Sequence, residues 1–241
     1  MRSLSIITIA IIACTLGCAR AETKWNALKV TWGINPFGPA FADLPRNVND
    51  AIRIGWTKIK GCSDGAVGDR YVLKGDESVV LIYNLAGEVS GVAQHIPKEN
   101  TGAGKFPRGK QLKSFDLEGE NYVINAYFTD PELICEEGSV STYNRLIFKS
   151  KQDTVEAEQK ESSGVEGFTK GRCFYSMGQH YWAAYASRLT PKTELGDFYP
   201  AFLLYSKGEL NGFGWAGWGS EKWLGYSKRV EHPSRYFNFQ S

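Results

Sequence analysis

Short runs of β-branched and aromatic residues, separated by glycine, aspartate or proline, cover much of the chain after residue 60. This pattern constrains the fold more than any other feature, because such runs are typical of β-strands and the residues between them of hairpin turns. The predicted strands are residues 70–75, 78–84, 87–94, 111–117, 121–128, 144–150, 198–206 and 208–215. We therefore expect a mainly antiparallel β fold, or an α+β fold, with a sheet, sandwich or barrel built from hairpins.

Two of the predicted hairpins share a sequence pattern. The residues VLIY and then GEVSG, within 80–91, correspond to FLLY and then GELNG, within 202–212, with one residue fewer between the blocks. An internal duplication of a hairpin unit explains this similarity, and so does independent convergence on the same turn chemistry. We expect the two hairpins to lie in related positions. The related halves are placed at about 60–150 and 171–241, on either side of a polar loop at 151–170.

One amphipathic helix is predicted from residue 47 to about residue 59. Asn47 or Asn49 is expected to cap its N-terminus, and Gly61 to end it. The face that carries Ile52 and Trp56 would pack against the sheet. The apolar positions that recur at helical spacing are Val48, Ala51, Ile52, Gly55, Trp56 and Ile59.

The first 21 residues have the pattern of a secretory signal peptide. Arg2 precedes an apolar run from about residue 4 to residue 16, and Ala-Arg-Ala at 19–21 forms a cleavage site of the A-x-A type. A membrane span needs about 20 apolar residues, so this run is too short for one. We therefore expect a single secreted, extracellular domain at 22–241 and no membrane span.

Three cysteines remain after removal of the predicted signal peptide, namely Cys62, Cys135 and Cys173. In an oxidising compartment two of them are expected to form one disulfide bond, and the sequence does not say which two. The third would be free, buried or bonded to another chain, so an oligomer through this cysteine stays open. Three widely spaced thiols do not form a zinc framework.

The composition is that of an ordinary folded protein. The formal net charge is +2, with 42% hydrophobic and 22% charged residues, and Lys and Arg are scattered along the chain. Binding to nucleic acid requires a concentrated positive field, which this pattern does not predict. We therefore expect no nucleic acid as partner.

Tryptophan and glycine are concentrated near the C-terminus. Trp215, Trp218, Trp223 and Tyr226 alternate with glycines, which allow a backbone to turn tightly and to approach a ligand closely. Flat rings on such a segment could stack on a sugar or on an apolar partner, so these four residues are the predicted ligand-binding surface. The alternative is that the rings cover one end of a barrel or sandwich and belong to a core.

Histidine is rare, with only His95, His180 and His232 in the chain. Three imidazoles are enough for an open catalytic zinc or copper site, but no two of them have the spacing that would place them on one element. They are therefore weak candidates for a metal site, and no cofactor is predicted. Cys173 and His180 could form a thiol–imidazole pair, although a core or disulfide role for the cysteine is the simpler reading.

Carboxylates suggest two further sites, each with a plainer explanation. Glu88 and Glu209 occupy the same place in the two similar hairpins and could act as a pair, or they could face solvent beside a turn glycine. The acidic residues around Pro131 could bind calcium, but they lack the EF-hand pattern and suit a solvated turn. These acidic residues are Asp130, Glu132, Glu136 and Glu137.

No nucleophile, phosphate-loop or zinc-protease motif is present. The leading hypothesis is a secreted binding or extracellular matrix protein that contacts carbohydrate or another extracellular protein through the aromatic segment. The alternative is a secreted enzyme, either metal-dependent through the three histidines or oxidative with an aromatic-lined pocket. A third reading is a toxin or defence protein, which the lack of a basic amphipathic helix disfavours.

Overall fold

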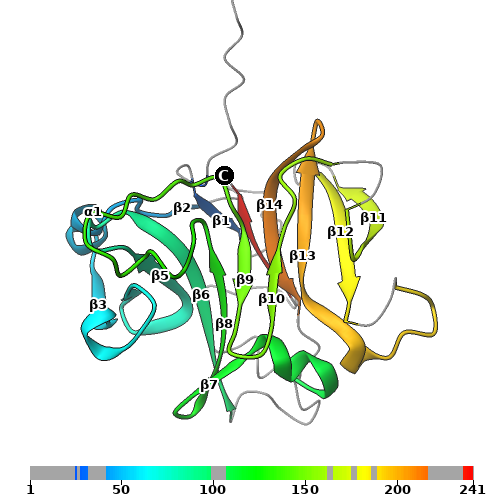
Figure 1. Cartoon of the computed structure of the whole chain (residues 1–241), viewed down its shortest axis with the longest axis horizontal. Helices are drawn as coiled ribbons and strands as arrows, with labels where there is room; N and C mark the ends of the chain where they lie inside the picture. Colours follow the sequence, from blue (N-terminus) through cyan, green and yellow to red (C-terminus); the bar gives the residue numbers. More distant parts are fainter. Residues whose placement is uncertain are drawn as a thin grey trace, which may run out of the picture.

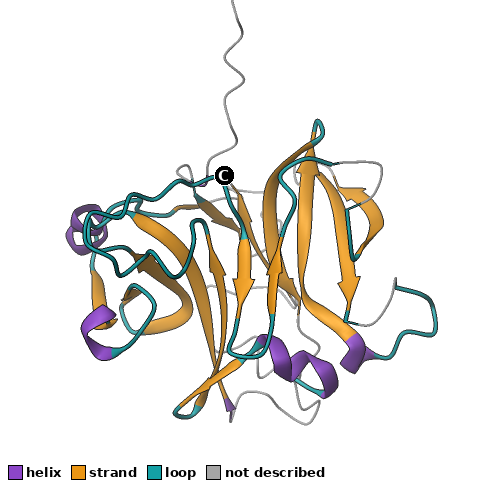
Figure 2. Cartoon of the chain, viewed as in Figure 1, coloured by secondary structure: helices purple, strands orange, loops and turns teal. Residues whose placement is uncertain are grey.

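The structure is a computed structural model that describes residues 25, 28–31, 42–98, 107–161, 165–174, 178–185, 189–216 and 236–240. The described strands form two antiparallel sheets, which we call sheet I and sheet II, and neither closes into a barrel among these residues (Figure 1). Only short helices join the strands (Figure 2). The prediction of a mainly antiparallel β fold is therefore confirmed.

Sheet I has eight strands. In spatial order they are β10 (Thr154–Glu156), β9 (Ile147–Lys149), β8 (Asn121–Tyr127), β6 (Val89–Pro97), β5 (Asp76–Tyr83), β4 (Asp69–Leu73) and β3 (Trp56–Lys60), with β7 (Asp116–Glu118) paired to β8. Sheet II has seven strands. Their order is β11 (Phe168–Phe174), β12 (Gly178–Ala184), β13 (Phe198–Ser206), β14 (Glu209–Ala216), β15 (Tyr236–Gln240), β1 (Lys29–Thr31) and β2 (Ala42–Asp43).

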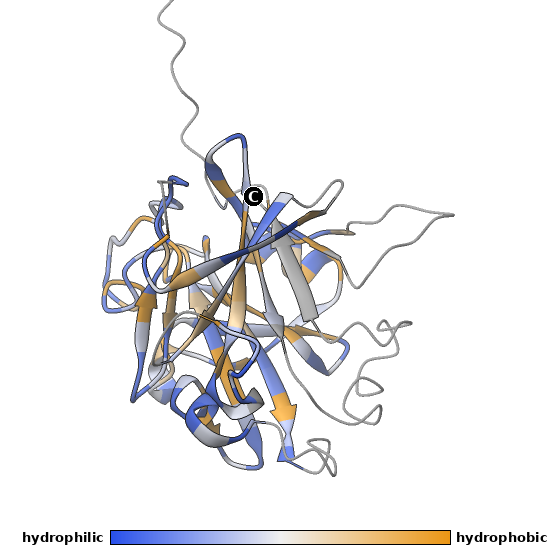
Figure 3. Cartoon of the chain, turned by 90° about the vertical axis from the view of Figure 1, so that its right-hand side faces the viewer, coloured by the Kyte–Doolittle hydropathy of each residue, from blue (hydrophilic) through white to orange (hydrophobic). Residues whose placement is uncertain are grey.

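The two sheets pack on one shared hydrophobic core, to which both contribute side chains. The Trp25 ring stacks on Phe128 of the sheet I half, with 5.3 Å between ring centroids, and meets Phe213 of β14 edge-on at 5.6 Å. Figure 3 shows hydrophobic residues mostly along the strands and hydrophilic ones mostly on the outer loops. The alternation of side chains along each strand thus directs one face of each sheet inward.

The two similar hairpins, β5–β6 and β13–β14, occupy the same place in their sheets and have the same register. Both carry a register shift at the equivalent position close to the turn. The paired residues there are Ile82–Gly91 and Tyr83–Val89 in one hairpin, and Leu204–Gly212 and Tyr205–Leu210 in the other. A bulge is an inserted residue that bends a strand, and its recurrence at one position favours duplication over chance convergence.

The equivalence continues into two crossing segments, residues 45–48 and 158–161, which each run along the turn end of one hairpin. In both, a buried tyrosine hydroxyl donates to the first carbonyl of the segment: Tyr83 to Pro45 at 2.8 Å and Tyr205 to Glu158 at 2.6 Å. The backbone bonds that follow are Val89 N to Arg46 O (2.8 Å) and Val48 N to Gly87 O (2.9 Å), and Leu210 N to Gln159 O (2.8 Å) and Glu161 N to Gly208 O (2.9 Å).

Each copy of the unit contributes its first two strands to the sheet of the other copy. The first copy consists of the pair β1–β2, the crossing segment 45–48 and the strands β3 to β8 of sheet I. The second copy consists of the pair β9–β10, the crossing segment 158–161 and the strands β11 to β15 of sheet II. The pair β1–β2 therefore lies beside β15 in sheet II, and β9–β10 lies beside β8 in sheet I (Figure 1). The two copies share one core. In this grouping β9 belongs to the second copy, whereas the predicted half 60–150 includes its residues. The polar stretch 151–170 contains β10 and the second crossing segment.

The predicted helix at 47–59 is wrong in its length. Helix α1 spans only Val48–Arg53, capped by Asn47, whose side chain accepts from Asp50 N at 2.9 Å. Gly55 adopts a left-handed φ of +94°, which ends the helix, and Trp56 and Ile59 lie in β3. Ile52 is 56% exposed, so it does not pack on the sheet. None of the described helices is long and apolar enough to cross a membrane.

The strand predicted at 111–117 is also mostly wrong. Residues Gly109–Ser114 form the 3₁₀ helix η4, and only Asp116–Glu118 pair as β7. The turn bonds Gln111 N to Arg108 O and Phe115 N to Leu112 O hold this helix. Hydrophobic residues do not alternate strictly along this stretch, so nothing directs it into the sheet.

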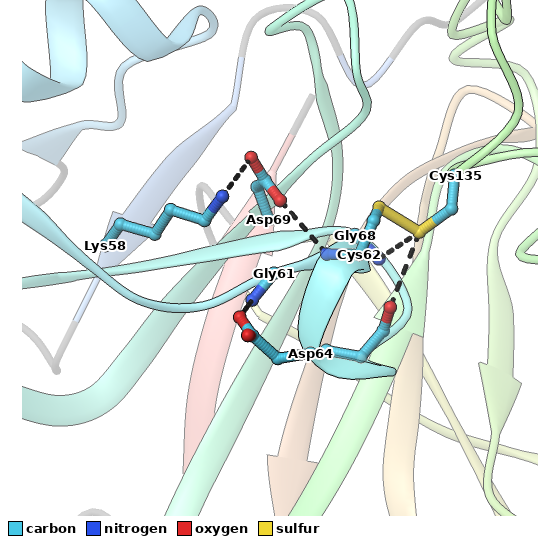
Figure 4. The surroundings of a disulfide bond; sticks show 8 residues. Lys58, Gly61, Cys62, Asp64, Gly68, Asp69 and Cys135 are labelled. Atoms are coloured by element: carbon cyan, nitrogen blue, oxygen red, sulfur yellow. Dashed lines mark hydrogen bonds and ion pairs between the residues drawn. A yellow bond between two sulfur atoms is a disulfide. The ribbon is translucent and has the colours of Figure 1, made fainter.

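The prediction of one disulfide bond is confirmed, between Cys62 and Cys135, whose Cα atoms are 5.7 Å apart (Figure 4). The bond joins the 3₁₀ helix η2 (Cys62–Asp64) to the turns after β8. Asp69 accepts from the Cys62 N–H at 3.1 Å and pairs with Lys58 at 2.7 Å, so the bridge lies in an ordered polar surrounding. Cys173 is a free, exposed thiol on β11.

Candidate functional site

A groove of about 410 Å³ lies where the β1–β2 pair, the first crossing segment and α1 meet. This volume is within the range of about 300–1,000 Å³ of small-molecule sites. Its apolar lining residues are Leu28, Leu44, Pro45 and Ile54. Its charged lining residues are Lys29, Arg46 and Arg53, together with Asp43 and Asp50. We call the four apolar residues the floor of the groove and the five charged residues its rim.

Backbone hydrogen bonds hold the floor of the groove in place. Leu44 N donates to Leu28 O at 3.0 Å and so closes the end of the strand pair. The carbonyl of Pro45 accepts from the Tyr83 hydroxyl, and the carbonyl of Arg46 accepts from Val89 N. The carbonyl of Arg46 is therefore used in a hydrogen bond to β6, while the residue itself is exposed.

The cations on the rim differ in their partners. Lys29 pairs with Asp43 at 3.5 Å, and Arg53 pairs with Asp50 at 2.8 Å. The hydrogen bond from Arg53 is the main cause that lowers the pKa of Asp50. No hydrogen bond or ion pair of the Arg46 guanidinium is recorded among the described residues. Three cations and two carboxylates thus leave the groove with a net positive charge, and Arg46 acts on Asp50 only from beyond ion-pair distance, where it helps to lower the pKa of that carboxyl.

The second copy provides an internal comparison for this groove. Leu28 and Leu44 correspond to Leu146 and Ala157, because Ala157 N donates to Leu146 O in the same way. The residues that correspond to Lys29, Arg46 and Pro45 are Ile147, Gln159 and Glu158. The second crossing is therefore built without a cation at these positions, so the fold does not require the basic residues of the first.

The aromatic segment is described only in part. Trp215 lies on β14 and is 3% exposed. Its ring meets Phe213 edge-on at 5.6 Å, within the shared core. Alternation along β14 directs Phe213 and Trp215 inward, and glycines occupy the positions between them. Trp215 therefore presents no ring to a ligand. Trp218, Trp223 and Tyr226 lie outside the described residues, and their predicted role stays a prediction.

The described histidines are not brought together. His95 on β6 has its Nδ1 at 2.5 Å from Glu77 and its Nε2 at 3.4 Å from Arg70. Because arginine can only donate, Nε2 must accept, and Nδ1 carries the proton that is donated to Glu77. The ring thus uses both nitrogens in internal hydrogen bonds.

His180 lies in the other sheet, on β12, and is 3% exposed. Its ring stacks on Phe202 at 5.2 Å, and burial lowers the pKa of His180. His232 lies outside the described residues. No group of three or more His, Cys, Asp or Glu side chains is placed to hold a metal ion within the described part of the chain. The geometry gives the predicted three-histidine site no support.

A polar cluster in sheet I was not predicted. Lys60 of β3 and Glu118 of β7 come from strands far apart in the sheet order, yet their Nζ and Oε2 atoms are 3.1 Å apart, so the sheet is strongly coiled. Arg70 is buried, pairs with Glu118 at 3.9 Å and donates to Asn125 at 3.0 Å. Burial acts to raise the pKa of Glu118, but Arg70 and Lys60 outweigh it and lower the pKa. No local sequence signal could reveal a cluster drawn from so many strands.

The remaining candidate residues have structural roles. Asp130 and Glu132 pair with Arg145 and Lys149, at 3.2 and 3.3 Å, as in a solvated turn. Glu88 accepts from Ser141 N at 3.0 Å. It directly precedes β6 of sheet I, whereas Glu209 begins β14 of sheet II at the equivalent hairpin position. These two glutamates therefore mark the duplication and do not form a carboxylate pair.

Across β11 and β12, Cys173 is opposite Gln179 in the register. A contact between Cys173 and His180 is not recorded among the described residues. The thiol–imidazole pair therefore remains a sequence hypothesis.

Comparisons of the chain with protein-family models, with curated proteins and with solved structures give no significant match. Function must therefore be inferred from the residues of the chain itself.

Proposed function

We propose that this chain is a secreted extracellular binding protein whose ligand is a carbohydrate or another extracellular protein, and that the groove beside α1 contacts this ligand. The observation that carries the proposal is the groove itself, with an apolar floor and an arginine whose guanidinium forms no ion pair or hydrogen bond among the described residues. Ligand sites commonly combine apolar surface with a few polar groups that fix orientation. The groove has both, and the second crossing forms without cations at the positions of Lys29 and Arg46.

The extracellular part of the proposal is supported by two features. Residues 1–21 have the pattern of a signal peptide, although they lie outside the described residues. The Cys62–Cys135 bond is of a kind that persists in oxidising compartments and is rare in the cytosol. A matrix role would follow if the ligand proves to be a component of the extracellular matrix.

A binding role is favoured over the enzyme hypothesis by the state of the histidines. A general base needs a ring nitrogen that can reach the substrate. His95 has both nitrogens in internal hydrogen bonds, and His180 is buried and stacks beside the rings of Trp182 and Phe202. The described histidines therefore offer no free base. Trp218, Trp223 and Tyr226 remain a second proposed contact region, on the sequence pattern alone.

The test uses purified mature protein on a glycan array and in pull-downs from extracellular extracts. Arg46→Gln would address the groove, Trp218→Ala/Trp223→Ala the aromatic segment, and Arg172→Gln would serve as a matched loss of an exposed cation on β11. We expect at least one ligand that binds wild type and the Arg172 variant equally and the Arg46 variant more weakly. A protein that binds no extracellular glycan or protein would refute the proposed function.

A further inference from the structure

We infer that the groove takes a saccharide unit that carries a carboxylate, as in a uronic acid, with the carboxylate bound by Arg46. This inference rests on the proposed function and narrows its ligand class. It depends on three observations. The lining of the groove has an excess of positive charge, its floor is apolar and its rim charged, and the second copy lacks cations at the positions of Lys29 and Arg46.

The excess positive charge selects an anion. Lys29 and Arg53 already form ion pairs with carboxylates of the protein, at 3.5 and 2.8 Å, whereas Arg46 forms no ion pair or hydrogen bond through its guanidinium among the described residues and acts on Asp50 only from a longer distance. A guanidinium is planar and presents paired N–H donors that match the two oxygens of a carboxylate. A carboxylate of the ligand can therefore bind Arg46 without breaking an ion pair of the protein.

The rest of the groove suits a sugar. Saccharide hydroxyls both donate and accept, and the rim supplies donors at Lys29 and Arg53 beside acceptors at Asp43 and Asp50. The C–H face of a sugar ring can lie on the apolar floor, where Ile54 is 50% exposed. A volume of about 410 Å³ is near the lower end for small-molecule sites and suits a small unit more than a broad protein surface.

An extended peptide is a poorer fit. Peptides that add to a sheet edge bind through a row of main-chain hydrogen bonds. The edge beside the groove is β2, which is only the two residues Ala42–Asp43. Within the described part of the chain this edge offers few backbone groups to a strand, so the proposed recognition relies on side chains.

The second copy shows that the basic residues are dispensable for the fold. Gln159 occupies the position of Arg46, and Ile147 that of Lys29, while the backbone bonds of the crossing stay the same. Replacement of Arg46 by glutamine therefore puts into the first copy a residue that the second copy already accommodates. The variant is expected to fold, and a loss of binding can be attributed to the lost charge.

The experiment is calorimetric titration of the full mature protein with three probes. They are a uronate-containing disaccharide, the same disaccharide with its carboxyl group reduced to an alcohol, and the capped peptide acetyl-Glu-Leu-Glu-amide. We expect the uronate probe to bind at least about tenfold more tightly than the reduced one, since a hydrogen-bonded charge pair is lost. Arg46→Gln should weaken uronate binding by about tenfold or more, and Arg172→Gln should leave it unchanged.

Three results would overturn the inference. They are equal affinity for the charged and reduced sugars, unchanged uronate affinity in Arg46→Gln, and binding of the acidic peptide with none of the uronate. In each case, ligands found on the array or in pull-downs would keep the binding function itself intact. Matching circular dichroism spectra and melting temperatures of wild type and Arg46→Gln would show that folding is not the cause of a loss.

Discussion

The equivalence of the two crossings predicts equal energetic costs for two distant substitutions, Tyr83→Phe and Tyr205→Phe. Each tyrosine is at most 1% exposed and donates its hydroxyl to the first carbonyl of a crossing segment, at 2.8 Å and 2.6 Å. Phenylalanine keeps the ring in the core but leaves that carbonyl without this donor. A lost hydrogen bond at a partly buried carbonyl costs about 1–2 kcal/mol.

The two costs should also add. Tyr83 and Tyr205 belong to different sheets and share no hydrogen-bond partner, so the double variant should lose about 2–4 kcal/mol, additive within about 0.5 kcal/mol. For a chain of this size, about 2–4 °C of melting temperature is lost for each kcal/mol. Tyr71→Phe is the matched control. Its ring contacts Tyr83 edge-on at 5.4 Å, but no hydrogen bond of its hydroxyl is recorded among the described residues.

The assay is equilibrium unfolding in urea, with the disulfide intact, for wild type, the two single variants, the double variant and the control. The slope of the free energy against urea concentration should be the same in all five, because the surface exposed on unfolding does not change. If either variant costs as little as Tyr71→Phe, its crossing bond does not hold the segment. If the two costs differ by more than about 1 kcal/mol, the copies are similar in geometry only.

Three further outcomes are expected. Burial raises the pKa of Tyr127 to about 12. The contribution of Tyr127 to stability should therefore be complete below about pH 10, where the unfolded tyrosine begins to ionise, and should fall as the pH rises toward 12. A series of melting temperatures against pH checks this, and melting temperatures that do not fall at alkaline pH would contradict it. Removal of the Cys62–Cys135 bond, which spans 73 residues, should cost about 2–4 kcal/mol in urea unfolding, and a double serine variant as stable as wild type would refute its stabilising role. Gly87→Ala should destabilise more than Gly208→Ala, because both have positive φ but only at Gly87 would the new Cβ meet a valine methyl group, at 2.8 Å; equal melting temperatures would contradict the clash.

The hairpins could be predicted because their signals are local. Gly87 and Gly208 have φ values of +78° and +81°, which the turns require, and the apolar runs on both sides suit strands. The helix at 47–59 was overextended because its helical spacing continued by coincidence into β3. The pattern did show the Asn47 cap correctly, which again is a local interaction.

Trp215 and Arg46 are residues whose surroundings the local sequence pattern does not predict. A tryptophan among glycines is compatible with a ligand surface or with a core, and only the pairing of β14 with β13 and β15 turns Trp215 inward. Arg46 has no distinctive sequence context. Its proposed role depends on the tertiary structure, in which its carbonyl accepts from Val89 N and its side chain lines the groove.

The sequence by itself determined the strands of the hairpins, their turns and the similarity of the two hairpins, because these depend on side-chain alternation and on backbone conformations within a few neighbouring residues. Only the tertiary structure decided that the two copies exchange their first strand pairs, which cysteines bond and which charges meet in the groove. Those choices depend on which distant segments pair, since a strand edge accepts any compatible partner and only the packing of the shared core selects one.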